Sequence, residues 1–325
     1  MRASCLVLGG GGFVGSALVR GLLAKEMRVV SIDNYAVGSG AHLVDLTGNV
    51  EVIEADVLDK RSFLDLVVKC ECEYLINCVG DTFVPECYDK PGRFFDINLM
   101  GCLNALEAAR KSHVKRVVYV SSTEVYGDAG AQPLSETCAL LPVNTYAVSK
   151  LAADRLCYTY SIEHGLSVVI ARIFNCYGPR ATHAYIIPEL IRQISRGDVV
   201  YVGNLESERD FTFVDDTVDA LIRLLVHPGI PSGDVVNIGT GQTHSVGSLV
   251  KNIAQIMGRS NVRVEQDVSR LRRRDISCFC CNNTKLAELT GWTPSVTFDE
   301  GLRRTVNWYV NNGRRWHFES NDSIR

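Results

Sequence analysis

Short apolar runs alternate with stretches whose apolar residues recur at helical spacing through the first half of the chain. The runs have strand length and are rich in β-branched residues, whereas the stretches between them are long enough for helices. We expect strands at 5–8, 28–32, 50–55, 74–79, 116–121 and 167–173, and helices at 13–25, 58–69, 93–111 and 144–164. Because strands that alternate with helices run parallel and are covered on both faces, the pattern predicts an α/β fold with a doubly wound parallel sheet.

The second half follows a looser pattern, interrupted at Pro179 and Pro188. We expect helices at 187–196, 245–257 and 299–310, a strand at 235–238, and a strand leading into a helix across 211–226. These elements predict a second, smaller domain built from separate pieces. The predicted division is a first domain of residues 1–175 that regains 211–240, a discontinuous second domain of 176–210 and 241–315, and a tail of 316–325.

Composition is typical of a soluble globular protein and argues against two classes of partner. Of the 325 residues, 46% are hydrophobic and 22% are charged, and the formal net charge is −3. A small negative net charge does not favour binding to nucleic acid or to an anionic membrane. The N-terminal apolar run breaks at once into glycines and no run reaches membrane-spanning length, so we expect a cytoplasmic protein with neither partner.

Twelve cysteines raise the question of a disulfide framework or a metal site. A framework is typical of short exported chains. Cys278 and Cys281 have the spacing of zinc ligands, but they lie in an apolar stretch without a second such pair or a histidine. We therefore expect buried thiols and no metal site.

A glycine-rich segment directly after the first strand has the spacing of a dinucleotide-binding loop. Gly9, Gly12 and Gly15 take its first, fourth and seventh positions, and Phe13 and Val14 open the helix that follows. Glycines let the backbone approach a pyrophosphate, whose charge then sits at the helix N-terminus. A plain glycine-rich turn is the alternative, and the strand–loop–helix context favours the cofactor site.

Acidic residues end the next two strands. Asp33 lies about twenty residues beyond the loop, where a carboxylate accepts the ribose hydroxyls of adenosine and repels a 2′-phosphate. We therefore expect NAD rather than NADP. Asp56 is placed to meet the adenine, although a helix cap explains it nearly as well. Their neighbours Asn34 and Val57 complete the expected cofactor contacts of these strand ends.

Tyr146 and Lys150 stand four residues apart in a predicted helix, which places them one turn apart on one face. A lysine cation favours ionisation of a nearby phenol, and the phenolate can then take a proton from a hydroxyl. Ser122, directly after the strand at 116–121, can hydrogen-bond the same substrate oxygen. The three residues predict a catalytic site, and an ordinary helix surface is the alternative for the pair.

The order of these motifs closely resembles the extended short-chain dehydrogenases/reductases that modify nucleotide sugars. The resemblance extends from about residue 5 to residue 312 and implies a Rossmann-type NAD-binding domain, a C-terminal nucleotide-sugar domain and a homodimer. The substrate class that it implies is a UDP-, GDP-, dTDP- or CDP-linked sugar. The matching segments are the glycine loop, Asn98 in Asp-Ile-Asn, Ser-Ser-Thr-Glu-Val-Tyr-Gly at 121–127, Tyr-x-x-x-Lys, 172–180, 209–216 and Gly-Trp-Thr-Pro at 291–294.

The resemblance also implies roles for single residues. It places Asn98 at the cofactor, and Asn175 and Arg209 at the sugar nucleotide. Arg209 is expected at the diphosphate, where a guanidinium fork suits phosphate, and a surface ion pair is its alternative. Arg270, from the arginine-rich segment 270–274, is our second candidate phosphate contact, and a solvated run of charge is the alternative there.

The chain departs from the family pattern after the fourth strand, where Val79 and Gly80 replace the usual pair of alanines. This loop normally lines the nicotinamide side of the site. Asp81 and Thr82, which follow it, are our expected substrate contacts, and the departure leaves their roles open.

Glu124 bears on which reaction follows the oxidation of the sugar at C4 that all family members share. It lies two residues after Ser122 and so faces the same side of an extended segment. The resemblance links an acid here to 4,6-dehydratases, in which it removes the C5 proton, and to uronate decarboxylases; a loop or cap carboxylate is the alternative. Thr123 stands where many dehydratases carry an acid for the leaving hydroxyl. We expect an NDP-sugar 4,6-dehydratase, with an NDP-uronate decarboxylase, an NDP-sugar 4-epimerase and a non-catalytic NAD-binding module as successive alternatives.

Overall fold

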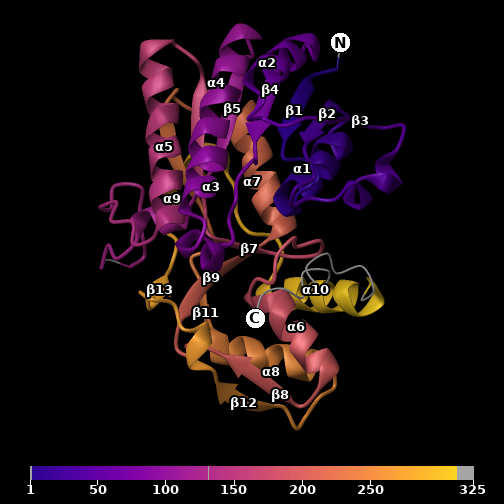
Figure 1. The fold of residues 1–325 in the computed structure, drawn as a ribbon, viewed down its shortest axis with the longest axis vertical. Coiled ribbons are helices and arrows are strands. Elements are labelled where there is room, and N and C mark those ends of the chain that lie inside the picture. The colour runs from indigo at the N-terminus through magenta and orange to yellow at the C-terminus, as the bar shows by residue number, and fades with distance from the viewer. Residues whose placement is uncertain (1, 131, 313–325) are drawn as a thin grey trace.

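The computed structural model describes residues 2–130 and 132–312, which form a larger and a smaller lobe (Figure 1). A seven-stranded sheet runs through the larger lobe in the order β10-β6-β5-β4-β1-β2-β3, and each neighbouring pair is parallel. This is the predicted α/β architecture. Its strands are β1 (Ser4–Leu8), β2 (Arg28–Asp33), β3 (Glu51–Glu54), β4 (Tyr74–Asn77), β5 (Arg116–Ser122), β6 (Val168–Ile173) and β10 (Asp234–Ile238).

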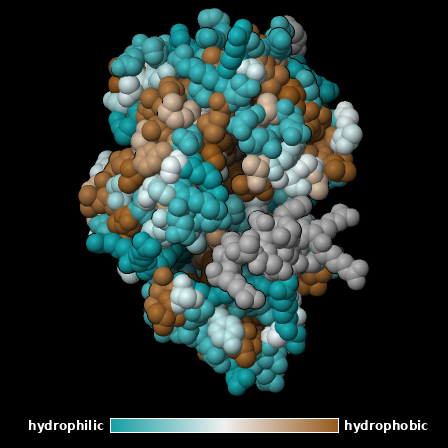
Figure 2. Space-filling view, in the orientation of Figure 1, coloured by the Kyte–Doolittle hydropathy of each residue, from teal (hydrophilic) through white to brown (hydrophobic). Residues whose placement is uncertain are grey.

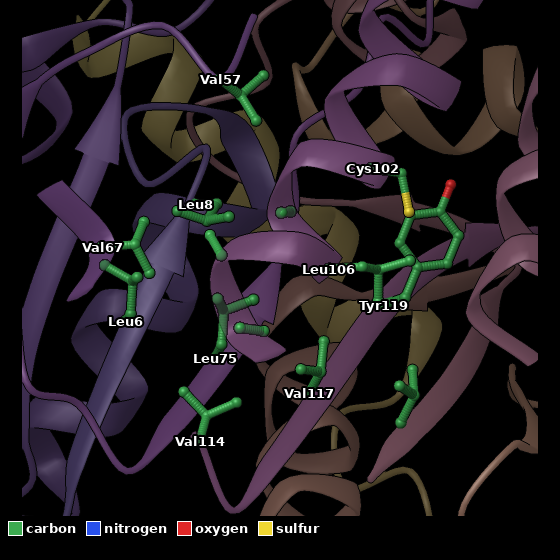
Figure 3. Close-up of a cluster of buried hydrophobic side chains, with 14 of the residues drawn as sticks. Leu6, Leu8, Val57, Val67, Leu75, Cys102, Leu106, Val114, Val117 and Tyr119 are labelled. Atoms are coloured by element: carbon green, nitrogen blue, oxygen red, sulfur yellow. The ribbon is translucent and has the colours of Figure 1, made fainter. Parts of the chain in front are cut away.

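Helices cover both faces of this sheet because its central strands are apolar on both sides. In β1, Leu6 and Leu8 point to one buried cluster and Cys5 and Val7 to another. Figure 3 shows the first cluster, in which sheet residues meet Val67 of α2 and side chains of α4. The covering helices are α2 (Lys60–Lys69), α4 (Gly101–Lys111) and α5 (Thr145–Glu163) on one face, and α1 (Phe13–Ala24) and α7 (Val214–Val226) on the other.

The helix expected at 93–111 is interrupted. The chain forms α3 (Pro91–Phe95), a π-helical turn at Asp96–Met100 and then α4. The buried Asn98 in the turn donates to the backbone carbonyl oxygen of Asp81 (3.0 Å) and to Ser149 Oγ (2.9 Å). Asn98 thus donates to two groups outside its own helix, which accounts for the widened turn. Such π-helical turns are frequent at functional sites.

The smaller lobe lies beyond the carboxyl ends of the strands of the large sheet, in the lower half of Figure 1. β9 begins at Glu208, earlier than expected, and pairs within this lobe, so only α7 and β10 of the segment 211–240 pack with the large sheet. The division into two domains stays a prediction, and the expected tail lies outside the described residues. The lobe contains β7 (Asn175–Tyr177), β8 (Val199–Val202), β9 (Glu208–Phe213), β11 (Thr243–Ser245), β12 (Arg263–Gln266), β13 (Cys278–Phe279), α6 (Ile186–Arg196), α8 (Val246–Ile256) and α10 (Phe298–Asn312), and α9 (Thr284–Thr290) packs next to β10.

No helix in the described ranges is long and apolar enough to cross a membrane. The face shown in Figure 2 mixes hydrophilic and hydrophobic residues. All twelve cysteines are free thiols. Within residues 2–130 and 132–312, no group of three or more histidine, cysteine or acidic side chains is arranged to hold a metal ion.

A buried ion pair locks α5 against the sheet. Asp154 of α5 accepts two hydrogen bonds from Arg172 of β6 (2.9 and 3.1 Å) and one from Ser121 of β5 (3.0 Å). Arg172 also donates to the hydroxyl of Tyr126 (3.1 Å), which donates to Asn237 of β10 (2.7 Å). With both charged side chains almost fully enclosed, each depends on the other for its solvation.

We expect Asp154→Ala to lower the free energy of unfolding by about 3–5 kcal/mol, because it leaves the Arg172 guanidinium buried without its counter-charge. Urea unfolding of the purified variant measures this. The matched control is Asp219→Ala, which breaks the exposed Asp219–Arg223 pair (2.7 Å) and costs less than about 1 kcal/mol. Equal losses in the two variants would contradict the structural role of the buried pair.

Candidate active site

A cleft of about 1790 Å³ runs along the carboxyl ends of the parallel strands and continues into the smaller lobe. Ligands of open α/β sheets bind at this edge. Its lining includes every predicted site residue except Asn98. The sequence motifs, scattered over some 260 positions, are therefore gathered into one continuous site.

The glycine loop joins β1 to α1 at one end of this cleft. Gly9 has a positive φ of 77°, and a Cβ added at Gly15 would come within 2.0 Å of the Gly9 carbonyl oxygen. Gly12 is the N-cap of α1 and supplies no side-chain hydrogen bond, so the first amides of the helix remain available to a ligand. Close packing and open donors fit the pyrophosphate of a dinucleotide.

Asp33 closes the loop from the end of β2. Its carboxylate accepts hydrogen bonds from the amides of Gly11 (2.9 Å) and Tyr35 (2.7 Å). Burial raises the pKa of Asp33, and these amide bonds oppose that shift. The acid is therefore fixed against the glycine loop at the carboxyl end of β2, and its contact with a ribose stays a prediction.

Asp56 is not the helix cap weighed as its alternative, because α2 begins at Lys60 and its N-cap is Asp59. It accepts a hydrogen bond from the amide of Leu58 (2.8 Å) in the turn before the helix, and another from Asn34 Nδ2 (3.0 Å). Both Asp56 and Asn34 line the cleft, as does Val57. The cofactor roles of these residues stay predictions.

Asn98 is the exception among the expected cofactor contacts. Besides its two donated bonds, its Oδ1 accepts from the amide of Asp81 (2.8 Å). The side chain thus ties the loop after β4 to Ser149 of α5, the residue before Lys150. In this structure Asn98 stabilises the positions of the β4 loop and of α5 by these hydrogen bonds, and direct contact with a cofactor stays a prediction.

Tyr146 and Lys150 project from the first turns of α5, which Asn144 caps by accepting from the amide of Ala147 (2.8 Å). Both side chains are buried. Burial raises the pKa of Tyr146, and a hydrogen bond with Ser122 partly opposes the shift. Burial also lowers the pKa of Lys150 to about 8. The Lys150 ammonium donates to the carbonyl oxygen of Val120 (2.6 Å).

Glu124 lies in the short turn that follows Ser122, with a buried side chain. Its Oε1 accepts from Arg272 Nη1 (3.0 Å) and its Oε2 from Asn144 Nδ2 (3.3 Å). The turn is held by Ser122 Oγ, which accepts from the amide of Glu124 (3.2 Å). Thr123 Oγ1 is buried and has no hydrogen-bond partner among the described residues. The carboxylate is therefore held in the cleft, close enough to Tyr146 for its charge to act on that phenol.

The expected substrate contacts are split between the two lobes. Arg209 is largely buried and pairs with Asp275 (3.1 Å), not with its sequence neighbours Glu208 or Asp210. Asn175 has a buried Oδ1 without a hydrogen-bond partner in the described ranges, so it is open to a ligand. Arg270 is half-exposed and pairs with Glu189 of α6 (3.1 Å).

The expected contacts of the β4 loop also line the cleft. Asp81 is buried against Arg93 (2.5 Å between Oδ2 and Nη2), and Thr82 shares a hydrogen bond with Tyr185 (2.6 Å). The charge of Asp81 contributes to the raised pKa of Tyr146. The substrate roles of Asp81 and Thr82 stay predictions.

Sequence reasoning missed four residues of this constellation: Asn144, Tyr185, Arg272 and Asp275. Asn144 had a signal, since an asparagine directly before a predicted helix is a typical cap. The arginine-rich segment was noted, but nothing in it distinguished Arg272. Tyr185 and Asp275 lie in irregular segments, for which periodicity gives no signal.

Comparisons with known proteins agree with this geometry. The family model described as GDP-mannose 4,6 dehydratase matches residues 6–305. The chain is 32% identical to UDP-N-acetyl-alpha-D-glucosaminuronate decarboxylase of Bacillus cytotoxicus, over 95% of this chain and 98% of the relative. The chain is also similar to solved crystal structures of this kind. UDP-glucose 4-epimerase of Thermotoga maritima, determined with UDP-glucose, has a TM-score of 0.87 at 28% identity and covers 95% of this chain and 99% of its own.

The second structure is DesIV of Streptomyces venezuelae, a dTDP-glucose 4,6-dehydratase crystallised with NAD. It has a TM-score of 0.87 at 28% identity and covers 96% of this chain and 98% of its own. These relatives include a decarboxylase, an epimerase and a dehydratase, which share one architecture and differ in reaction. The extent of the matches establishes that the chain belongs to the extended short-chain dehydrogenase/reductase family of NAD-dependent nucleotide-sugar epimerases and dehydratases.

Proposed function

We propose that this enzyme is a nucleotide-sugar 4,6-dehydratase, which oxidises the sugar at C4 and then removes water across C5 and C6. The observation that carries the proposal is the buried carboxylate of Glu124, held in the turn after Ser122 and beside Tyr146. A carboxylate at this place can remove a proton that an adjacent ketone has made acidic.

The residues of the glycine loop and Asp33 suit NAD. The open N-terminus of α1 would bind the pyrophosphate and the Asp33 carboxylate the ribose hydroxyls. When bound, NAD would take the hydride from C4 and return it to C6. The long cleft and the unpaired Asn175 oxygen support a nucleotide-linked sugar at the other end.

The first proton transfer falls to Tyr146. Its phenolate, which hydrogen-bonds Ser122, takes the proton of the C4 hydroxyl as the C4 ketone forms. The Lys150 cation stabilises the phenolate, which burial alone disfavours.

Elimination falls to Glu124. It takes the C5 proton, the C6–O bond breaks, and the leaving hydroxyl accepts that proton to depart as water. Tyr146 then returns its proton to C5. The net change is loss of one water and formation of a 4-keto-6-deoxy sugar. Thr123 cannot supply a strong acid, so Glu124 would serve as base and then as proton donor.

A uronate decarboxylase is the second candidate, and Arg272 is the observation that favours it. Its guanidinium lies beside Glu124 in the cleft, where it would attract a C6 carboxylate. The Bacillus relative has that type of activity in its name.

We also propose a homodimer through α4 and α5. Val148, Tyr158 and Ile162 of α5 and Met100 before α4 are exposed hydrophobic side chains of this helix pair. Burying them between two copies would remove that apolar surface from water.

Asp33→Ala should weaken NAD binding at least about tenfold and reduce the discrimination against NADP, because it removes both the ribose acceptor and the charge that repels a 2′-phosphate. Titration calorimetry with each cofactor measures the two affinities. Asp45→Ala, which removes an exposed carboxylate near the loop, is the matched control and should leave both unchanged. Equal affinities in Asp33→Ala and the parent enzyme would disprove the ribose role.

Glu124→Gln should abolish turnover while the oxidation at C4 persists, because only the C5 step needs the carboxylate. Mass spectrometry after incubation with UDP-, GDP-, dTDP- and CDP-sugars in heavy water identifies the reaction of the parent enzyme. A product lighter by water with deuterium at C5 supports the dehydratase, one lighter by carbon dioxide the decarboxylase, and one of unchanged mass an epimerase. Full turnover by Glu124→Gln would rule out its role as the C5 base.

Lys150→Met should cost at least about 100-fold in rate yet stabilise the cofactor-free protein at neutral pH by about 1–2 kcal/mol. The pKa of Lys150, about 8, is lowered by burial, so the charged form destabilises the fold below that pH. This cost fades as pH rises toward the ordinary pKa of lysine, so the difference between variant and parent should shrink. Urea unfolding at pH about 7 and about 9.5 tests it. A variant less stable than the parent at neutral pH would contradict the argument.

A further inference from the structure

The arginine-rich segment of residues 270–274, here called the arginine loop, crosses the cleft. It belongs to the smaller lobe, between β12 and β13. Arg270 remains within that lobe, on Glu189. The other three arginines contact residues of the larger lobe. Arg272 pairs with Glu124 (3.0 Å), Arg274 pairs with Asp128 (2.8 Å), and the guanidinium of Arg273 lies over the ring of Tyr88 (4.9 Å).

Arg272 differs from its neighbours in what it touches. Arg274 pairs with an exposed carboxylate, and Arg273 stacks on a ring, whereas Arg272 contacts the buried acid of the reaction centre. Burial of the guanidinium disfavours its charge, but the carboxylate of Glu124 more than offsets this and raises the pKa of Arg272. The two ions therefore stabilise each other inside the cleft.

The two oxygens of Glu124 are held unequally. Oε1 accepts a charge-assisted bond from Arg272 at 3.0 Å, while Oε2 has only the longer contact of 3.3 Å with Asn144. A base must be ionised and must aim a free lone pair at the proton it removes. The ion pair engages Oε1 and leaves Oε2 for the proton.

Other groups interact with Glu124 only electrostatically. Arg209 approaches from the smaller lobe, Tyr146 from α5, and Tyr88 and Cys87 from the segment after β4. In the described ranges, the ion pair of Glu124 is with Arg272. The orientation of the carboxylate depends on that arginine.

We propose that Arg272 is the positioning residue of the C5 base: it holds Oε1 of Glu124 so that Oε2 faces the sugar, and the C5 step depends on the arginine loop lying across the cleft. This rests on the proposed function. Oxidation at C4 does not need the pair, because Tyr146, Lys150 and Ser122 all belong to the larger lobe. The arginine thus acts on the second chemical step and leaves the first intact.

The test separates the two steps in Arg272→Gln, Arg272→Lys and the matched control Arg273→Gln, which removes one charge from the same loop without touching Glu124. Single-turnover absorbance of the reduced cofactor follows oxidation at C4, and mass spectrometry in heavy water follows exchange at C5, with the NDP-sugar that the parent enzyme converts. We expect Arg272→Gln to oxidise C4 within about threefold of the parent rate but to slow C5 exchange roughly 100-fold. Arg272→Lys should recover part of the loss, and Arg273→Gln should match the parent in both steps.

Two further variants keep the proposal distinct from the proposed function. If Glu124→Gln blocks C5 exchange and Arg272→Gln does not, positioning by Arg272 is wrong and the assignment of the base survives. If Glu124→Gln leaves exchange intact, the base itself is wrong. In the double variant, Arg272→Gln should add no further slowing to Glu124→Gln, since its target is already gone. A weakened affinity for the NDP-sugar with both rates unchanged would instead make Arg272 a phosphate contact and overturn the proposal.

Discussion

The Asp154–Arg172 ion pair is the constraint on which the geometry of the active site depends. It joins α5, which carries Tyr146 and Lys150, to β6, and through Ser121 to β5, the strand that ends in Ser122. A bidentate pair between enclosed charges tolerates little displacement, because either ion left alone would be buried without compensation. The distance between the helix that holds the tyrosine and the strand end that holds the serine is thereby fixed from within the core.

Burial has a second consequence, which falls on the catalytic groups themselves. It disfavours the phenolate of Tyr146 and the ammonium of Lys150 alike, so each ion is costly at its buried position. Such opposed shifts are typical of groups that must exchange protons near neutral pH. The sheet, the capped helix α5 and the hydrogen bonds of Asn98 offset the cost of burying these two titratable groups.

On the proposed function, the chemistry is divided between the lobes. The larger lobe contains the glycine loop, Tyr146, Lys150 and Glu124, whereas the smaller lobe contributes Arg209 and the arginine loop. The relatives carry different activities in their names, and the two solved structures share the fold of this chain. On the proposed function, segments of the smaller lobe decide which charge meets the sugar beyond C4, and they can change without disturbing the core.

The sequence by itself determined the parallel sheet, the glycine loop, Asp33 and the Tyr146–Lys150 pair, because each depends on local periodicity or on spacing within one element. Glu124 was singled out by the resemblance and by its spacing from Ser122 on an extended segment, but the structure folds residues 123–126 into a short helical turn. Only the tertiary structure decided that β9 pairs within the smaller lobe, that Asn98 interrupts a helix to reach Asp81 and Ser149, and that Arg272 rather than Arg270 meets Glu124. These contacts join residues as many as 148 positions apart. Several of them lie in irregular segments, where the chain has no hydrophobic periodicity from which the contacts could be predicted.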